Sequence, residues 1–290
     1  MSLVEKVLEK MQQQAAQGAS TPAPGPRTVA PAAAATPEQP PHPPARTVVI
    51  DQDALRAAGQ LPPRHQEREL ARQYRRIKRP LVMKATGRGD ARVPNGHLIM
   101  LTSALPGEGK TFTSINLAFS MALERDIRVL LVDADVAKPH ISRLLGLENE
   151  RGLLDLLRDE SLDVESLILP TTTPRLSILP AGQRTENATE LLASERMQQI
   201  VTQIGEHDPS RIVIFDSPPL LLTTESQTLA QVMGQIVLVV RAGSTSHQAV
   251  LDAVGLLGEG RSVSLVLNQS VSEPDSAYYY GYDSPADGSA

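Results

Sequence analysis

A run of nine residues, Ser103-Ala-Leu-Pro-Gly-Glu-Gly-Lys-Thr111, follows an apolar segment and precedes apolar residues at helical spacing. Glycines let the backbone fold its N–H groups around phosphate oxygens, and a helix beginning there adds a positive dipole end. Lys110 would reach the β and γ oxygens, and the Thr111 hydroxyl would bind Mg²⁺. The strict pattern begins with glycine, where this chain has Ala104. A glycine-rich turn can also simply cap a helix, but the run predicts a nucleotide-binding loop over Pro106, Gly107, Glu108, Gly109, Lys110, Thr111 and Phe112.

Three aspartates follow two other apolar segments. Asp133 and Asp135 end the stretch Leu130-Leu-Val-Asp-Ala-Asp135, and Asp216 lies within Val213-Ile-Phe-Asp-Ser-Pro-Pro219. A carboxylate directly after an apolar strand can supply the hard oxygen that hydrated Mg²⁺ bound to ATP needs. One such aspartate is more often a turn or cap residue, but three beside a phosphate loop predict a site for ATP and Mg²⁺.

The elements that must position these residues are short apolar runs separated by helical stretches. Continuous apolar strands that alternate with helices are typical of a parallel sheet covered on both faces. The expected fold class is α/β, a P-loop NTPase-type parallel sheet with helices on both faces. Ligands of such sheets bind at the carboxyl ends of the strands, where Asn268 would contact adenine or form a turn. The predicted strands cover residues 98–102, 129–132, 176–179, 212–215, 236–240 and 263–267.

Composition divides the rest of the chain. Nine prolines between Pro22 and Pro44 predict a disordered Pro/Ala-rich linker, and the residues before it have amphipathic helical spacing. Residues 64–92 carry ten Lys or Arg against three acids, and a basic helix is predicted from His65 to Lys78, stopped by Pro80. The expected organisation is an amphipathic helix (1–14), a linker (15–45), a basic helical lead-in and oligomerisation segment (46–96), a P-loop domain (97–270) and a disordered tail (271–290).

Composition also excludes several functions. The absence of cysteine excludes disulfides, thiolate zinc sites and iron–sulfur clusters. A net charge of −5, no Trp and 3% aromatic residues argue against nucleic-acid binding, so subunit contact is favoured for the basic helix. No apolar stretch is long enough for a membrane span or forms a signal peptide, which predicts a cytoplasmic protein, held at the membrane surface if at all by a partner.

In combination, the loop at 104–111 and the stretches at 130–139 and 213–219 resemble the Walker A, Walker A′ and Walker B motifs of bacterial tyrosine kinases (BY-kinases). The opening Met-Ser-Leu-Val-Glu-Lys and the segment Tyr74-Arg-Arg-Ile-Lys-Arg-Pro-Leu81 further resemble tyrosine autokinases associated with exosortase-type exopolysaccharide loci. That resemblance implies ATP-dependent autophosphorylation that regulates exopolysaccharide synthesis or export. It also implies a separate membrane-spanning chain-length-determinant protein, a polysaccharide co-polymerase, as partner.

The resemblance also assigns roles to residues. Lys110, Asp133 and Asp135 would be catalytic, with Asp133 orienting or deprotonating the incoming tyrosine, and the metal ligands would be Thr111, Asp135 and Asp216. The family's Glu-x-x-Arg-x-x-Arg helix, which contacts a neighbouring subunit, has two possible registers here. One uses Glu69, Arg72 and Arg75; the other uses Arg72, Arg75 and Lys78 and has no Glu.

The tyrosines of the C-terminal tail distinguish a kinase from other nucleotide-binding proteins of this fold class. Four of the five tyrosines in the chain are Tyr278, Tyr279, Tyr280 and Tyr282. They would be phosphoacceptors presented to an active site, in trans, although a tail that packs on its own domain is the other reading. The rival function is a partitioning or division-site ATPase switch without kinase activity. Those proteins carry an additional Lys at the position of Leu105 and need no tyrosine cluster.

Overall fold

The computed structural model describes residues 46–87, 93–258 and 260–270. The predicted helix at 1–14, the linker at 15–45 and the tyrosine tail at 271–290 lie outside the described residues. None of the helices in these ranges is long and apolar enough to cross a membrane.

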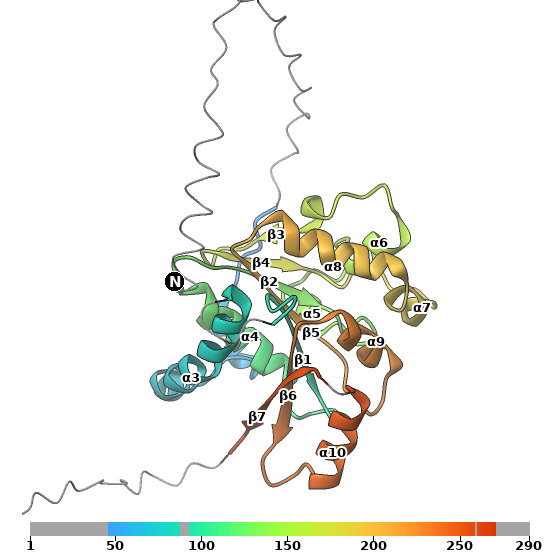
Figure 1. Ribbon diagram of the computed structural model, residues 1–290. Helices are drawn as coiled ribbons and strands as arrows, with labels where there is room; N and C mark the ends of the chain where they lie inside the picture. Colours follow the sequence, from blue (N-terminus) through green and yellow to red (C-terminus); the bar gives the residue numbers. More distant parts are fainter. Residues whose placement is uncertain (1–45, 88–92, 259, 271–290) are drawn as a thin grey trace, which may run out of the picture. The chain divides into compact units, whose positions relative to one another are not determined.

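The described residues form one seven-stranded sheet in the order β3-β4-β2-β5-β1-β6-β7 (Figure 1). All neighbouring strands are parallel except β3 and β4. This confirms the α/β prediction, and each of the six expected strands is present. The strands are β1 (Leu98–Ser103), β2 (Arg128–Asp133), β3 (Leu169–Pro170), β4 (Leu176–Leu179), β5 (Arg211–Asp216), β6 (Gln235–Arg241) and β7 (Ser262–Asn268).

The sheet is covered on both faces, and alternate residues of its strands enter two different cores. In β1, Met100 joins one apolar cluster, whereas Ile99 and Leu101 join the other. Burial on both sides explains why the central strands are continuously apolar. One face is covered by α3 (Glu67–Thr86), α4 (Lys110–Ala122) and α5 (His140–Leu144), and the other by α6 (Leu153–Arg158), α7 (Ala188–Leu192), α8 (Glu195–His207), α9 (Thr224–Val232) and α10 (His247–Leu256).

One local prediction was wrong, and one short strand was not predicted. The edge strand β3 was missed because it has only two residues and contains Pro170, and an edge strand tolerates a residue without an N–H. The basic helix does not stop at Pro80: α3 continues to Thr86 and ends at Gly87 in the left-handed conformation. Pro80 lies on the exposed side of α3, so the carbonyl it leaves without a partner can bind water, while buried Leu81 holds the helix against the core.

Short elements lead into α3. They are α2 (Gln52–Ala57), capped by Asp51, and a 3₁₀ turn, η1 (Arg64–Gln66). Lys78 fixes α3 to α4 because its Nζ lies 2.7 Å from the carbonyl of Ser120 and 2.6 Å from Glu124. Through these contacts the lead-in segment packs beside α4, the helix that follows the glycine-rich loop. Elsewhere in the chain, a second 3₁₀ turn, η2 (Glu165–Leu167), precedes β3.

Candidate active site

The glycine-rich loop connects β1 to α4 and has the shape that phosphate binding requires. Gly107 and Gly109 have φ angles of 79° and 91°, in the left-handed region that favours glycine. No side chain caps the start of α4 at Gly109. The N–H groups of its first turn are therefore available to a ligand, and the helix dipole favours an anion there. This donor set fits the phosphates of a nucleotide.

Two side chains hold the loop in this shape. Glu108 is 3% exposed; its Oε2 accepts a hydrogen bond of 2.8 Å from the Leu105 N–H, and its Oε1 accepts one from the Thr245 hydroxyl. Asn268, at the end of β7, donates from Nδ2 to the Glu108 carbonyl at 2.9 Å. A Cβ atom at Gly109 would lie 2.0 Å from that nitrogen. Asn268 thus anchors the loop as well as lying beside the cavity.

Lys110 forms an ion pair with Asp135, one of the three predicted carboxylates. Its Nζ lies 2.8 Å from Oδ2 of Asp135, and both side chains are largely buried. Burial alone would lower the pKa of Lys110, but the nearby carboxylates of Asp216 and Asp135 outweigh it and raise that pKa. Lys110 is therefore a fixed positive charge at the loop.

Asp216, at the end of β5, is fully buried and holds the first turn of α4. Its Oδ2 accepts 2.7 Å from the Thr111 hydroxyl, and its Oδ1 accepts 2.9 Å from the Ser114 hydroxyl. Burial raises the pKa of Asp216, and the Lys110 charge and these two hydrogen bonds oppose that rise. Ser114 was not among the predicted site residues. The one feature of the sequence that could have indicated it is its position one helical turn after Lys110, on the same face of α4.

Asp133 lies opposite Asp216 in the register of β2 and β5 and is fully buried. Its Oδ2 accepts two hydrogen bonds from Ser142, 2.7 Å from the N–H and 2.8 Å from the hydroxyl. Its Oδ1 is buried without a partner among the described residues. Burial, with a further contribution from Asp216, raises the pKa of Asp133 to about 7.

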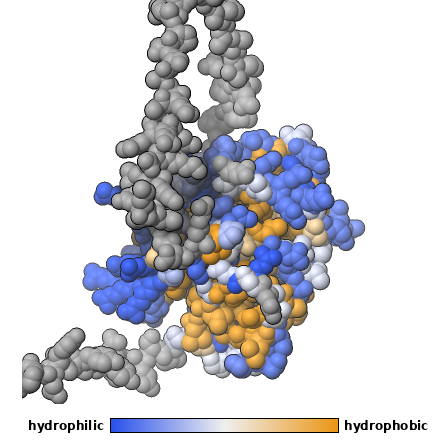
Figure 2. All heavy atoms as spheres, in the orientation of Figure 1, coloured by the Kyte–Doolittle hydropathy of each residue, from blue (hydrophilic) through white to orange (hydrophobic). Residues whose placement is uncertain are grey.

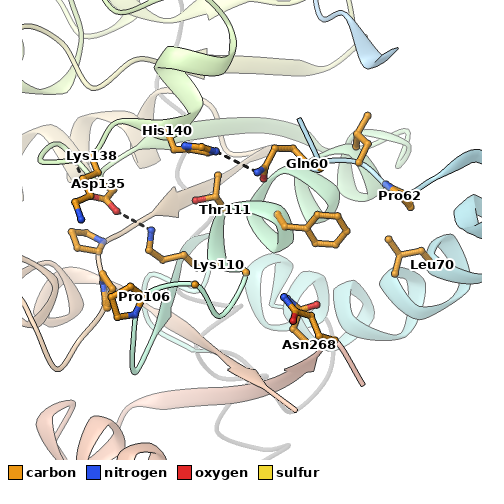
Figure 3. Close-up of a pocket in the computed structure, with 18 of the residues that line it drawn as sticks. Gln60, Pro62, Leu70, Pro106, Lys110, Thr111, Asp135, Lys138, His140 and Asn268 are labelled. Atoms are coloured by element: carbon orange, nitrogen blue, oxygen red, sulfur yellow. Dashed lines mark hydrogen bonds and ion pairs between the residues drawn. The ribbon is translucent and has the colours of Figure 1, made fainter. Parts of the chain in front are cut away.

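A cavity of about 1260 Å³ opens over the loop (Figure 3). Most of the predicted site residues line it, but Glu108, Asp133 and Asp216 do not and lie behind its wall. In Figure 3, Lys110 and Asp135 lie together on one side, and Asn268, Leu70 and Pro62 lie on the other. The predicted residues on its surface are Pro106, Gly107, Gly109, Lys110, Thr111, Phe112, Asp135 and Asn268.

Sequence reasoning missed the opposite wall of this cavity. Gln60, Leu61 and Pro62, between α2 and η1, lie there, together with residues of α3. The Gln60 carbonyl accepts 2.9 Å from Asn116 of α4, and Gln60 Nε2 lies 3.3 Å from Nε2 of His140. No motif marks this segment, so only tertiary packing brings it to the site.

The carboxylates do not form a metal cage. Within the described ranges, no group of three or more His, Cys, Asp or Glu side chains is arranged to hold a metal ion. A Mg²⁺ ion here would depend on nucleotide phosphates and water, with Thr111 as the hydroxyl ligand and Asp135 and Asp216 nearby. The residues present fit a metal that arrives with its nucleotide.

Comparison with known proteins decides the family. Residues 96–254 match the model of an AAA domain. Over 187 residues the chain is 35% identical to the tyrosine-protein kinase YwqD of Bacillus subtilis, an alignment that covers 63% of this chain and 77% of that protein. The chain belongs to the bacterial tyrosine-protein kinase family.

Solved structures and longer relatives agree with this assignment. The kinase domain of the Escherichia coli tyrosine kinase ETK matches with a TM-score of 0.55 and 30% identity, covering 63% of this chain and 71% of that one. The tyrosine-protein kinase wzc of Salmonella typhimurium is 30% identical over 195 residues, or 65% of this chain, but the alignment covers only 27% of that protein. The kinase described here is thus a nucleotide-binding protein-tyrosine kinase that matches a limited part of the longer relatives.

Proposed function

We propose that this kinase transfers the γ-phosphoryl group of Mg·ATP to Tyr278, Tyr279, Tyr280 and Tyr282 of its own C-terminal segment. One observation carries the proposal. The cavity that holds the phosphate loop and Lys110 is also walled by Asn268, Gln269 and Ser270, the last described residues before that segment. In the step, a tyrosine oxygen bonds to the γ phosphorus, the bond to the β–γ bridging oxygen breaks, ADP leaves, and the hydroxyl proton passes to a carboxylate.

The chain's own residues supply positioning and charge. Lys110 and the free N–H groups of the loop would hold the phosphates, and Lys110 would stabilise the negative charge of the transferring group. Mg²⁺ bound at Thr111, with Asp135 and Asp216 completing the site through direct or water-mediated contacts, would neutralise further charge on the phosphate oxygens. The Asp216 hydrogen bonds to Thr111 and Ser114 fix the hydroxyl that this site needs.

Asp133 is our proposed acceptor of the tyrosine proton. Ser142 fixes its Oδ2, its Oδ1 has no partner within the described ranges, and its raised pKa favours proton uptake near neutral pH. Asp135 is the alternative, because it lines the cavity directly.

Substitution of each aspartate distinguishes the two candidates. If Asp133 is the acceptor, Asp133→Asn should remove the pH dependence of the single-turnover transfer rate between about pH 6 and 8, and Asp135→Asn should preserve it. A pH dependence that survives in Asp133→Asn would contradict this role and leave Asp135 as the candidate.

We further propose that transfer occurs between chains. A mixture of two inactive partners tests this: Lys110→Met supplies acceptor tyrosines without catalysis, and the Phe variant of all four tail tyrosines supplies catalysis without acceptors. Tail phosphate on the Lys110→Met chain, detected by mass spectrometry, is the expected result. Absence of phosphate from that mixture, with wild type labelled in parallel, would show that transfer stays within one chain.

The cellular role that we propose is control of exopolysaccharide synthesis or export, by a cytoplasmic kinase recruited to a membrane-spanning co-polymerase. Support comes from the resemblance of the first six residues and of residues 74–81 to the exopolysaccharide-associated autokinases. Cells carrying Lys110→Met in place of the wild type should secrete less polymer, or polymer of altered length, at equal kinase abundance. Unchanged polymer amount and length would contradict this role while leaving the kinase activity standing.

A further inference from the structure

The outer side of α3 carries a stripe of arginines. At 100° per residue, five of them fall within about 100° of the helix circumference, opposite the buried side chains of Tyr74, Lys78 and Leu81. All five are exposed, and Figure 2 shows this helix as a strongly hydrophilic projection of the domain. The members of this arginine stripe are Arg68, Arg72, Arg75, Arg76 and Arg79.

The arginine stripe has little to neutralise it within the described part of the chain. Arg72 lies 3.5 Å from Glu69, and this is the one ion pair that any of the five makes there. The other acid at the start of α3, Glu67, pairs with Arg56 instead. Closely spaced guanidinium groups with few partners favour an anionic ligand, and their planar forks match phosphate geometry.

The last described residue before the tyrosine segment lines the same cavity as this helix. Glu69 and Gln73 of α3 line the same cavity as Ser270, the last described residue before the segment. Tyr278 is eight residues beyond Ser270, a reach of up to about 28 Å for an extended chain. The twenty residues of α3 span about 30 Å. The tyrosines can therefore reach the arginine stripe of their own chain.

We infer that the arginine stripe binds the C-terminal segment of the same chain once its tyrosines are phosphorylated. The inference rests on the proposed autophosphorylation. Four phosphotyrosines would add about −6 to −8 charges to a segment that already carries four acids and no Lys or Arg. The negative charge is repelled from a cavity that holds nucleotide phosphates and Asp135, and it is attracted to the guanidinium groups beside that cavity.

This binding would couple phosphorylation to assembly. Arg72 and Arg75 belong both to the arginine stripe and to the helix proposed to contact a neighbouring subunit. A phosphorylated segment lying on them would occupy the subunit contact. The phosphorylated segment and the neighbouring subunit would then compete for the same surface of α3. Phosphorylation would separate the subunits in this way, and also because the charged segment leaves the neighbour's cavity.

The test uses the full-length protein and a fluorescent peptide of residues 271–290, with all four tyrosines either phosphorylated or not. Binding is measured by fluorescence anisotropy at low and at high salt. The test variant is Arg68→Gln/Arg76→Gln/Arg79→Gln, which spares the proposed subunit-contact residues. The matched control is Arg151→Gln/Arg158→Gln/Arg184→Gln, which removes three exposed arginines that lie outside α3 and do not line the cavity.

Wild type and control should bind the phosphorylated peptide at least about ten-fold more tightly than the unphosphorylated one, and high salt should remove the difference. The α3 variant should lose about ten-fold in affinity, and equal affinity of the α3 variant and the control would overturn the inference. Autophosphorylated wild type should bind the peptide several-fold more weakly than the unphosphorylated protein; equal binding would overturn the same-chain contact. If mass spectrometry finds no phosphate on the tail of the wild type, the proposed autophosphorylation is contradicted. The peptide measurement still shows, independently of that result, whether the arginine stripe binds the phosphorylated segment.

Discussion

The two walls of the nucleotide cavity are built from charges in opposite environments. On the loop wall, Lys110 and Asp135 are largely buried and lie 2.8 Å apart, and Asp216, behind that wall, is fully buried and accepts a hydrogen bond from Thr111. On the lead-in side, the Arg64–Asp53 and Arg72–Glu69 ion pairs are exposed, whereas Arg56, which pairs with Asp53 and Glu67, is largely buried. The five arginines of the stripe on α3 lie outside the cavity lining, and only Arg72 makes an ion pair within the described residues. Buried paired charges are costly to disturb and suit chemistry, whereas exposed charges add little stability and remain available for recognition. We therefore expect substitutions on the loop wall to affect transfer, and those on the lead-in wall to affect assembly.

The largest expected effect comes from removing the loop cation. Lys110→Met should lower autophosphorylation by at least about 10² to 10³-fold, because the transferring phosphoryl group loses the positive charge that would stabilise it. Phosphate incorporation per chain, measured at saturating ATP, checks this. Lys84→Met is the matched control, since Lys84 bonds Ser262 at 3.0 Å and does not line the cavity. Retained phosphorylation in a folded Lys110→Met protein would refute the site.

A smaller loss, with partial rescue, is expected at Asp216. Asp216→Asn weakens the negative environment of Mg²⁺ and the hydrogen bonds to Thr111 and Ser114. Activity should fall by about 10- to 100-fold at millimolar Mg²⁺ and recover in part as Mg²⁺ is raised. A Mg²⁺ titration of the initial rate measures this, with the exposed Asp252→Asn as control. An unchanged Mg²⁺ dependence would remove Asp216 from the metal site.

The buried carboxylate of Asp133, behind the loop wall, should also lower the stability of the fold. The folded pKa of Asp133 is about 7 against 3.8 in the unfolded chain, so the folded state binds the extra proton and stability is lost as pH rises from about 4 to 7. Asp133→Asn should therefore stabilise the nucleotide-free and metal-free protein at pH 8 by on the order of 2 to 4 kcal/mol, and much less at pH 5. Thermal unfolding at both pH values measures this. A stabilisation that is the same at pH 5 and pH 8 would contradict the assignment of that pKa.

The smallest effect on catalysis is expected on the lead-in wall. Arg72→Gln/Arg75→Gln should leave nucleotide affinity within about two-fold of wild type, because exposed charges contribute little to the fold. The assembled mass in light scattering should nevertheless fall, since these residues belong to the proposed subunit contact. A variant that keeps the wild-type mass would place that contact elsewhere.

The loop wall was predictable from the sequence because its chemistry is local. The phosphate loop and the aspartates that end two strands are contiguous motifs, and a parallel sheet brings the ends of its strands to one edge. Ser142 and Gln60 were not predictable, because their contacts with Asp133 and with α4 depend on how distant elements pack. The continuation of α3 past Pro80 was missed because local propensity was overridden by burial of Leu81.

Mapping the phosphate after incubation with Mg·ATP tests the central claim most directly. Wild type, Lys110→Met and the variant with Phe at all four tail tyrosines are compared by mass spectrometry of the whole chain. We predict phosphate on Tyr278, Tyr279, Tyr280 or Tyr282 in wild type, and none in either variant incubated alone. Phosphate at Tyr74, or equal labelling of wild type and the Phe variant, would contradict the claim that this cavity serves the C-terminal tyrosines.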